Sequence, residues 1–189
     1  TGELGIRCTT TCEPSDGPIG NLIRQVFKGR IKMPAGENKN INSGDLFDEQ
    51  MAYLFAADRH DHLYNDIDGI FSILNKGISV ICTRYYFSSL AYHCSNESDF
   101  IFVQELNKNF PQPDLIVYLD NPVEVSIKRM ESRKFKDSYE NHKKLTQAKE
   151  NYKKAISNYK GNILIVTATE PQENIKTAIK EKIIELFNE

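Results

Sequence analysis

Residues 80–92 read Val-Ile-Cys-Thr-Arg-Tyr-Tyr-Phe-Ser-Ser-Leu-Ala-Tyr, a short β-branched run that changes abruptly into polar and aromatic residues. Strands buried in a parallel sheet typically have such short, continuous apolar runs. In open sheets of this kind, ligands bind outside the carboxyl ends of the strands. The stretch therefore predicts a buried strand over Ile78–Cys82 and a ligand site that begins near Arg84.

Three other short apolar segments share this organisation. They are Ile6–Thr11, Leu115–Leu119 and Ile163–Val166, and each precedes turn or cap residues and then a helical pattern. The helical patterns lie at 46–74, at 99–110, after Pro122, at 137–161 and from 169 onward. Because strands alternate with helices, the sequence predicts an α/β fold with a doubly wound parallel sheet.

The composition is ordinary for a globular protein and limits the classes of function. The 189 residues, 40% of them hydrophobic, are enough for one domain with a substantial core. A net charge of −2 provides no basic field for nucleic acid, and no apolar run approaches the roughly 18 residues that a membrane helix needs. The four cysteines form no Cys-x-x-Cys pair, which favours reduced thiols in a cytoplasmic protein. We expect no metal site, because His60 and His62 would lie on different faces of a helix.

Four motifs follow one another along nearly the whole chain. They are TCEPSDGPIG at 11–20, LFAADR at 54–59, TRYYFSSLAY at 83–92 and PDLIVYLDNPVEV at 113–125. The first resembles the Thr-Arg-Glu-Pro-Gly-Gly-x-Pro-x-Gly loop of thymidylate kinases, and the third resembles their Asp-Arg-Tyr-x-x-Ser-Ser-x-Ala-Tyr segment. Because all four motifs match that family in order and at similar spacing, the chain resembles a thymidylate kinase.

The resemblance implies a P-loop nucleoside monophosphate kinase fold, in which helices flank a parallel sheet in three layers. The family opens with a strand, a phosphate-binding Gly-x-x-x-x-Gly-Lys-Ser/Thr loop and a helix, and this sequence contains no such pattern. We therefore expect residues 1–189 to form an N-terminally truncated domain without the central first strand of a sheet ordered 2-3-1-4-5. Residues 129–140 are expected to form a lid within it.

The resemblance also implies a reaction. A thymidylate kinase transfers the γ-phosphoryl group of ATP, with Mg²⁺, to the small-molecule substrate dTMP and produces dTDP and ADP. The family usually forms homodimers, through helices near 46–63. No nucleic acid or membrane partner is implied.

The acceptor site is expected around Phe55 and Arg59. Residues four apart on a helix lie on one side, where an aromatic ring can stack on a base and a guanidinium can donate to a carbonyl oxygen. By resemblance, Phe55 stacks on thymine and Arg59 bonds the edge of the base. Without the other motifs, Phe55 would be interpreted as a core residue and Arg59 as part of a surface ion pair. The other acceptor-binding residues that the resemblance implies are Glu13, Arg24, Tyr85, Ser88, Ser89 and Tyr92.

Three arginines are the implied catalytic residues. By resemblance, Arg84 grips the acceptor phosphate, because a guanidinium fork suits two phosphate oxygens. Arg129 and Arg133 fall in the lid, four apart, where arginine can stabilise charge on a transferring phosphoryl group. A solvated basic face is the alternative for this segment, as a solvated charge is for Arg24. Thr167 and Ala168 fall near the adenine of ATP in the family.

Several positions depart from the family pattern. Thr83 replaces an aspartate that is expected near magnesium or the phosphates, and Cys12, Ser138 and His93 replace an arginine, a lid arginine and a glutamine. The acceptor side is therefore better preserved than the donor and metal side. Two alternatives to a thymidylate kinase stay open: a nucleotide-binding homologue without kinase activity, and a related kinase for another deoxynucleoside monophosphate.

Overall fold

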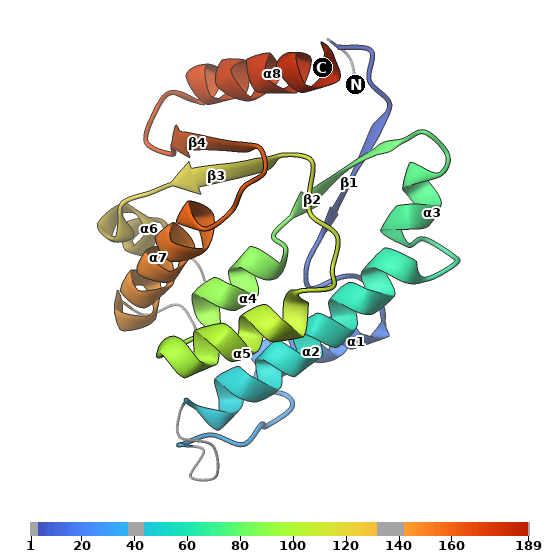
Figure 1. Ribbon diagram of the computed structural model, residues 1–189. Helices are drawn as coiled ribbons and strands as arrows, with labels where there is room; N and C mark the ends of the chain where they lie inside the picture. The colour runs from blue at the N-terminus through green and yellow to red at the C-terminus, as the bar shows by residue number, and fades with distance from the viewer. Residues whose placement is uncertain (1–3, 38–43, 132–141, 189) are drawn as a thin grey trace.

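The structure is a computed structural model that describes residues 4–37, 44–131 and 142–188 (Figure 1). The strands are β1 (Cys8–Cys12), β2 (Ser79–Thr83), β3 (Ile116–Asp120) and β4 (Ile163–Thr167). The helices are α1 (Pro18–Phe27), α2 (Leu46–Tyr64), α3 (Ile70–Leu74), α4 (Tyr86–Tyr92), α5 (Glu97–Asn107), α6 (Val123–Glu131), α7 (His142–Ser157) and α8 (Gln172–Asn188). The predicted alternation of strands and helices is confirmed, with strand ends that shift by no more than two residues.

The four strands pair two by two, and both pairs are parallel. β1 pairs with β2, and β3 pairs with β4. The registers place Cys12 opposite Thr83 and Asp120 opposite Thr167, so the two strands of each pair reach their carboxyl ends together. Within the described residues, no strand connects β2 to β3. Among the described residues the four strands therefore form two separate two-stranded parallel sheets.

Helices lie on both sides of the strands. In Figure 1, α8 lies along one side of β3 and β4, and α1, α2, α4 and α5 gather on the other side. Helices α6 and α7 lie beyond the carboxyl end of β3, and α7 packs against α4. The structure therefore has the α/β layers that the sequence predicted.

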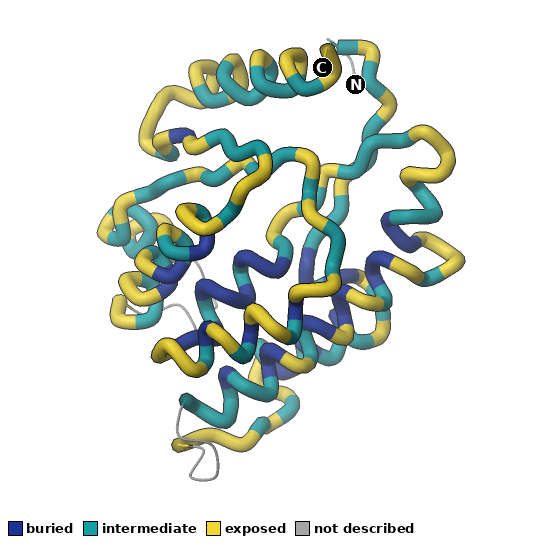
Figure 2. The backbone as a smooth tube through the Cα atoms, viewed as in Figure 1, coloured by how far each residue is buried: buried dark blue, intermediate teal, exposed yellow. Residues whose placement is uncertain are grey.

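Burial is concentrated in the layer that contains α1, α2, α4 and α5. One apolar cluster joins α4, α5 and α7 through residues such as Phe87, Val103 and Ala155, and a second joins α1 and α2 through Ile23 and Met51. Figure 2 shows little burial along β3, β4 and α8, and α8 has no buried residue. The strands accordingly leave apolar side chains exposed, which are Ile81, Val117, Leu119 and Ile165.

Local hydrogen bonds determine where the site-bearing helices begin. The Asp45 carboxylate caps α2 by accepting from the amide of Phe47 at 2.8 Å, and Asn96 caps α5 by accepting from the amide of Asp99 at 3.0 Å. Such side-chain caps satisfy amides that the first turn of a helix leaves unpaired. The caps thereby fix the start of the two helices that contain Phe55, Arg59 and, as described below, Asn107.

The helical pattern at 46–74 proves to be two helices rather than one. The Asn65 side chain accepts from the amides of Ile67 and Asp68 at 3.1 and 2.9 Å, which turns the chain away from the helix axis. Gly69 follows, and a Cβ atom there would lie 2.3 Å from the carbonyl oxygen of Asn65. The turn therefore requires glycine, and α3 begins after it. The first residues of the helical pattern predicted at 137–161 lie outside the described residues.

No helix in the described part of the chain has both the length and the apolar character that crossing a bilayer requires.

Candidate active site

The loop after β1 is held against α1 and α2. The amide of Glu13 donates to the carbonyl oxygen of Thr83 at 3.1 Å, so the loop leaves the strand pair at its carboxyl end, and the Glu13–Pro14 peptide bond is cis. Two residues further, the Ser15 amide and hydroxyl donate to the two oxygens of the fully buried Asp58 carboxylate at 2.8 and 2.6 Å. Gly20 of α1 lies so close that a Cβ atom there would be 2.0 Å from the carbonyl oxygen of Ser15. The loop is thus clamped between two helices.

Arg24 of α1 completes this clamp. Its guanidinium donates to the carbonyl oxygens of Pro14, at 2.6 Å, and Ser15. It also forms an ion pair with the exposed Asp16 carboxylate, with 3.1 Å between Nη2 and Oδ1. In the described structure Arg24 therefore stabilises the Glu-Pro loop, and its contact with an acceptor phosphate remains a prediction.

Arg59 of α2 lies at the centre of a buried polar cluster. Its Nε and Nη2 donate to Oε2 of Glu13 at 3.1 and 2.6 Å, and both side chains are 1% exposed. Nη2 also donates to the Ser89 hydroxyl at 3.3 Å, and the Tyr85 ring centroid lies 5.3 Å from Cζ. Three other predicted site residues therefore contact Arg59, which are Glu13, Tyr85 and Ser89.

His62, one turn further along α2, extends the cluster. Its Nε2 lies 2.7 Å from the Thr11 hydroxyl, and its Nδ1 lies 3.7 Å from Oε1 of Glu13. That second separation is too long for a hydrogen bond, and neither of its two atoms has a hydrogen-bond partner among the described residues. This contact was not predicted from the sequence, because the motif match ends at Arg59.

Arg84 occupies an unusual backbone conformation between β2 and α4. Its φ of +71° is positive, and it is the one non-glycine residue with positive φ in the described chain. Left-handed conformations cost a non-glycine residue roughly 1–2 kcal/mol, and such outliers persist where the surrounding structure enforces them. The exposed guanidinium carbon lies 5.3 Å from the Tyr92 ring centroid. Arg84 and Tyr92, at the two ends of the motif, therefore face one surface.

Tyr152 of α7 joins this second group, although no motif includes it. Its hydroxyl oxygen lies 2.6 Å from that of Ser88. Burial raises the pKa of Tyr152, and the charge of Arg84 and hydrogen bonds from Ser88 and Arg84 oppose that rise. The Tyr92 ring lies edge-on to it, with centroids 6.2 Å apart. The contact between Tyr152 and Ser88 could not be predicted from the sequence, because 64 positions separate the two residues.

Phe55 packs between an aromatic ring and an imidazole. Its ring centroid lies 6.2 Å from that of Phe27 and 5.2 Å from that of His93. Phe55 is half-buried, so part of its ring stays accessible. Burial, with smaller contributions from the charges of Arg59 and Lys144, lowers the pKa of His93 to about 3. Phe55 therefore lies beside a neutral imidazole, and no described contact places it against a bound base.

The predicted donor-side residues meet at the ends of β3 and β4. Arg129 of α6 is exposed and donates through Nη2 to the carbonyl oxygen of Ala168 at 3.2 Å. The Ala168 amide donates to the carbonyl oxygen of Asp120 at 2.8 Å, which fixes the chain after β4 beside the end of β3. Thr167 is exposed at that edge. Arg133 and most of the predicted lid lie outside the described residues.

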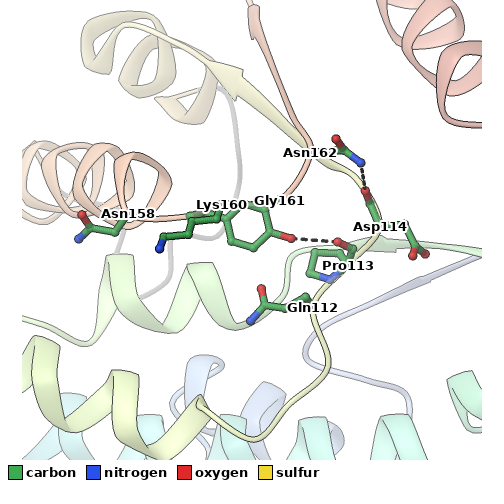
Figure 3. Close-up of a pocket in the computed structure, with 8 residues that line it drawn as sticks. Gln112, Pro113, Asp114, Asn158, Lys160, Gly161 and Asn162 are labelled. Atoms are coloured by element: carbon green, nitrogen blue, oxygen red, sulfur yellow. Dashed lines mark hydrogen bonds between the residues drawn. The ribbon is translucent and has the colours of Figure 1, made fainter. Parts of the chain in front are cut away.

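Two hollows on the described part of the surface differ in their relation to this site. A hollow of about 480 Å³ lies between the residues that precede β3 and β4, and its lining includes Tyr159, which donates to the carbonyl oxygen of Pro113 (Figure 3). This is the amino edge of the strands, whereas ligands of parallel sheets bind at the carboxyl edge. A smaller hollow, of about 130 Å³, includes Tyr92, Leu119 and Tyr152 in its lining and lies on the side of the predicted site.

The described residues do not fit a magnesium ion by themselves. No group of three or more histidine, cysteine, aspartate or glutamate side chains among them is arranged to bind a metal. Thr83 occupies the position of the expected carboxylate and carries no charge. Mg²⁺ prefers carboxylate and phosphate oxygens, and the described side chains alone do not supply such a set.

The parallel strand pairs and the polar residues at their carboxyl ends define an α/β protein with a candidate ligand site at that edge. A family model described as thymidylate kinase matches residues 2–179. The chain therefore belongs to the thymidylate kinase family.

Individual relatives agree with this assignment. A protein of Methanococcus aeolicus named "Probable thymidylate kinase" is 34% identical over 182 residues, which cover 93% of this chain and 82% of that protein. A protein of Thermococcus kodakarensis with the same name is 33% identical over 186 residues, which cover 98% of this chain and 86% of that protein. A Treponema pallidum protein that also carries the thymidylate kinase name is 41% identical over 123 residues, or 65% of this chain and 52% of that protein.

Proposed function

We propose that the protein binds dTMP and transfers the γ-phosphoryl group of ATP to it, giving dTDP and ADP. The observation that supports this proposal most directly is the convergence of α2 and α4. Arg59 of α2 contacts Ser89 of α4 and Tyr85, which immediately precedes that helix, and α4 carries Ser88 and Tyr92 on its Arg84 side. One seven-residue helix therefore connects the group that is expected to read the base with the group that is expected to hold the phosphate.

The proposed roles follow from the chemistry of each group. The exposed part of Phe55 stacks on thymine, and Arg84 donates hydrogen bonds from its guanidinium fork to the 5′-phosphate. Arg129 approaches the transferring phosphoryl group, near Thr167 and Ala168 at the donor side. Arg24 holds the Glu-Pro loop and Glu13 holds Arg59, and contact of either residue with the nucleotide stays a prediction. The protein's own contribution is then mainly positioning and charge neutralisation.

The function is tested by two measurements on the same protein. Calorimetry is expected to show saturable binding of dTMP, and a coupled assay is expected to show ADP release from ATP that depends on dTMP. Arg59→Ala should weaken dTMP binding at least tenfold, since about 1.4 kcal/mol corresponds to a factor of ten. Binding of dTMP without dTMP-dependent ADP release would contradict the transfer reaction and identify a nucleotide-binding homologue.

We also propose that two copies of the chain associate through α2 and α5. Tyr53 and Tyr64 of α2 and Ile101 of α5 are large apolar side chains that are about half exposed. Tyr53 packs edge-on against Phe102 of α5, with centroids 5.2 Å apart, so the two helices share this surface. Exposed apolar surface of this kind typically marks an interface. Sedimentation at several concentrations tests the proposal, and Tyr53→Glu is expected to convert a dimer into a monomer.

All four cysteines lie in the described residues and are free. Free thiols are typical of a reducing compartment. They support the proposal of a cytoplasmic location, which fractionation of the source cells would test.

A further inference from the structure

Asn107, the last residue of α5, is a buried polar side chain that none of the recognised motifs includes. It is 4% exposed and lies 48 positions from Arg59 in the chain. Its Oδ1 accepts a hydrogen bond from Nη1 of Arg59. A buried amide in direct contact with the central arginine of the candidate site calls for a functional explanation.

The orientation of this amide is fixed by its two neighbours. Nδ2 of Asn107 donates to the carbonyl oxygen of Val103 at 2.7 Å. A carbonyl oxygen can only accept, and a guanidinium can only donate. The two contacts therefore permit one orientation of the amide, with its oxygen toward Arg59.

The contacts of Arg59 account for four of its five N–H groups. Nε and one N–H of Nη2 donate to Glu13, the other N–H of Nη2 donates to Ser89, and one N–H of Nη1 donates to Asn107. The aromatic rings of Tyr85 and Phe110 have centroids 5.3 and 5.5 Å from Cζ. Among the described residues, the second N–H of Nη1 is the donor for which the structure shows no hydrogen bond. Asn107 thus accepts from one N–H of Nη1, the nitrogen whose other N–H has no hydrogen bond among the described residues.

The neutral charge of Asn107 matters as much as its position. Glu13 already balances the charge of Arg59 in a site where both are shut away from water. A second carboxylate would leave a net negative charge there and weaken the attraction of the guanidinium for an electron-rich ligand atom. An amide oxygen orients the guanidinium without adding charge.

We propose that Asn107 is a positioning residue that orients Nη1 of Arg59 so that its remaining N–H donates to a carbonyl oxygen of the pyrimidine base. The inference rests on the proposed function, since it assumes that Arg59 reads the acceptor base. At ring position C4, thymine presents a carbonyl oxygen, whereas cytosine presents an amino group that can only donate. A correctly oriented N–H therefore favours dTMP over dCMP.

The test compares three variants of the full chain by calorimetry with dTMP and with dCMP. Asn107→Ala removes the acceptor, and Asn107→Asp retains an acceptor at the same place. Val103→Ala is the matched control, because it truncates a buried side chain one turn away on α5 and retains the backbone carbonyl. We expect Asn107→Ala to lower the dTMP-to-dCMP affinity ratio about tenfold. Asn107→Asp should lower the ratio less than Asn107→Ala, because it keeps the acceptor but adds a charge that weakens the attraction of the guanidinium for the base. Val103→Ala should leave the ratio unchanged.

A second readout needs no ligand and separates this inference from the proposed function. In ¹⁵N spectra of the arginine side chains, restricted rotation should keep the Nη signals of Arg59 distinct in the parent protein and in Asn107→Asp. In Asn107→Ala they should broaden or merge. Failure of the parent protein to bind dTMP would refute the proposed function. Unchanged Nη signals and an unchanged affinity ratio in Asn107→Ala, or an equal loss in Val103→Ala, would overturn the positioning role.

Discussion

The Arg59 guanidinium lies 2.6 Å from the Glu13 carboxylate in an ion pair whose two side chains are each 1% exposed. The pair joins the loop after β1 to α2, across 46 positions of the chain. Removing one partner of such a pair leaves an uncompensated buried charge, which typically costs about 3–5 kcal/mol. The pair therefore connects the stability of the fold directly to the geometry of the candidate site.

Glu13→Gln is expected to lower the free energy of unfolding by about 3 kcal/mol or more, because the shape is retained and the charge is lost. Urea unfolding measures this change. The matched control is Glu105→Gln on the surface of α5, where the ion pair with Lys108 is well exposed and should contribute less than about 1 kcal/mol. Equal losses in the two variants would show that burial of the Arg59 pair has no special energetic role. Adding Arg59→Met to Glu13→Gln should recover part of the loss, since the unpaired charge is then removed.

Substitutions at Arg84 separate its backbone strain from its charge. Arg84→Ala removes the guanidinium but keeps a Cβ atom at a φ of +71°, whereas Arg84→Gly removes both. The glycine variant is therefore expected to be about 1 kcal/mol more stable than the alanine variant. Both should bind dTMP about 10- to 100-fold more weakly than the parent, because a charged hydrogen bond to phosphate is worth about 1.5–3 kcal/mol.

Thermal unfolding and calorimetry with dTMP provide the two readouts for Arg84. Arg30→Ala, at an exposed arginine outside the candidate site, serves as the charge control and should leave both unchanged. If the alanine variant were as stable as the glycine variant, the strained conformation would relax without cost. Parent-like dTMP affinity in both would exclude Arg84 from the phosphate site.

Arg129 provides a test of the donor side. Arg129→Ala is expected to lower kcat by about three powers of ten, as removal of an arginine that stabilises the transferring phosphoryl group typically does. Its contact with the carbonyl oxygen of Ala168 is exposed, so the loss of stability should stay small. The affinity for dTMP alone should not change. Lys128→Ala, at the exposed neighbouring position on α6, is the control, and an equal fall in kcat there would point to the general charge of the helix instead.

The elements that the sequence predicted well are those determined by local patterns. The apolar runs of β2 and β4 and the proline and cap residues of the helices act within a few positions, and the strands lie within two residues of their predicted ends. The division of α2 from α3 was missed because it depends on the Asn65 side chain turning back onto the backbone, which an apolar count does not detect.

In the candidate site, residues within motifs were predicted, and contacts between distant parts of the chain were not. Phe55, Arg59 and the residues of α4 were found because each belongs to a motif. Asn107 and Tyr152 were missed because their contacts with Arg59 and Ser88 span 48 and 64 positions of the chain. The burial of Arg59 could not be predicted either, since only the folded chain brings Glu13, Ser89 and Asn107 around one guanidinium.

His93 predicts how stability depends on pH. Burial keeps its imidazole neutral and lowers its pKa from 6.5 to about 3, so between these values the unfolded chain binds a proton that the folded chain does not. Stability is therefore expected to fall as the pH drops below about 6.5, with a slope of at most about 1.4 kcal/mol per pH unit from this group.

His93→Gln should flatten that dependence, because glutamine does not titrate, while His60→Gln, at an exposed histidine, should leave it unchanged. Urea unfolding at a series of pH values between about 4 and 7 measures the difference. An identical slope in the parent and in His93→Gln would mean that His93 becomes protonated in the folded protein. In that case the imidazole beside Phe55 would carry a charge in the folded protein at low pH.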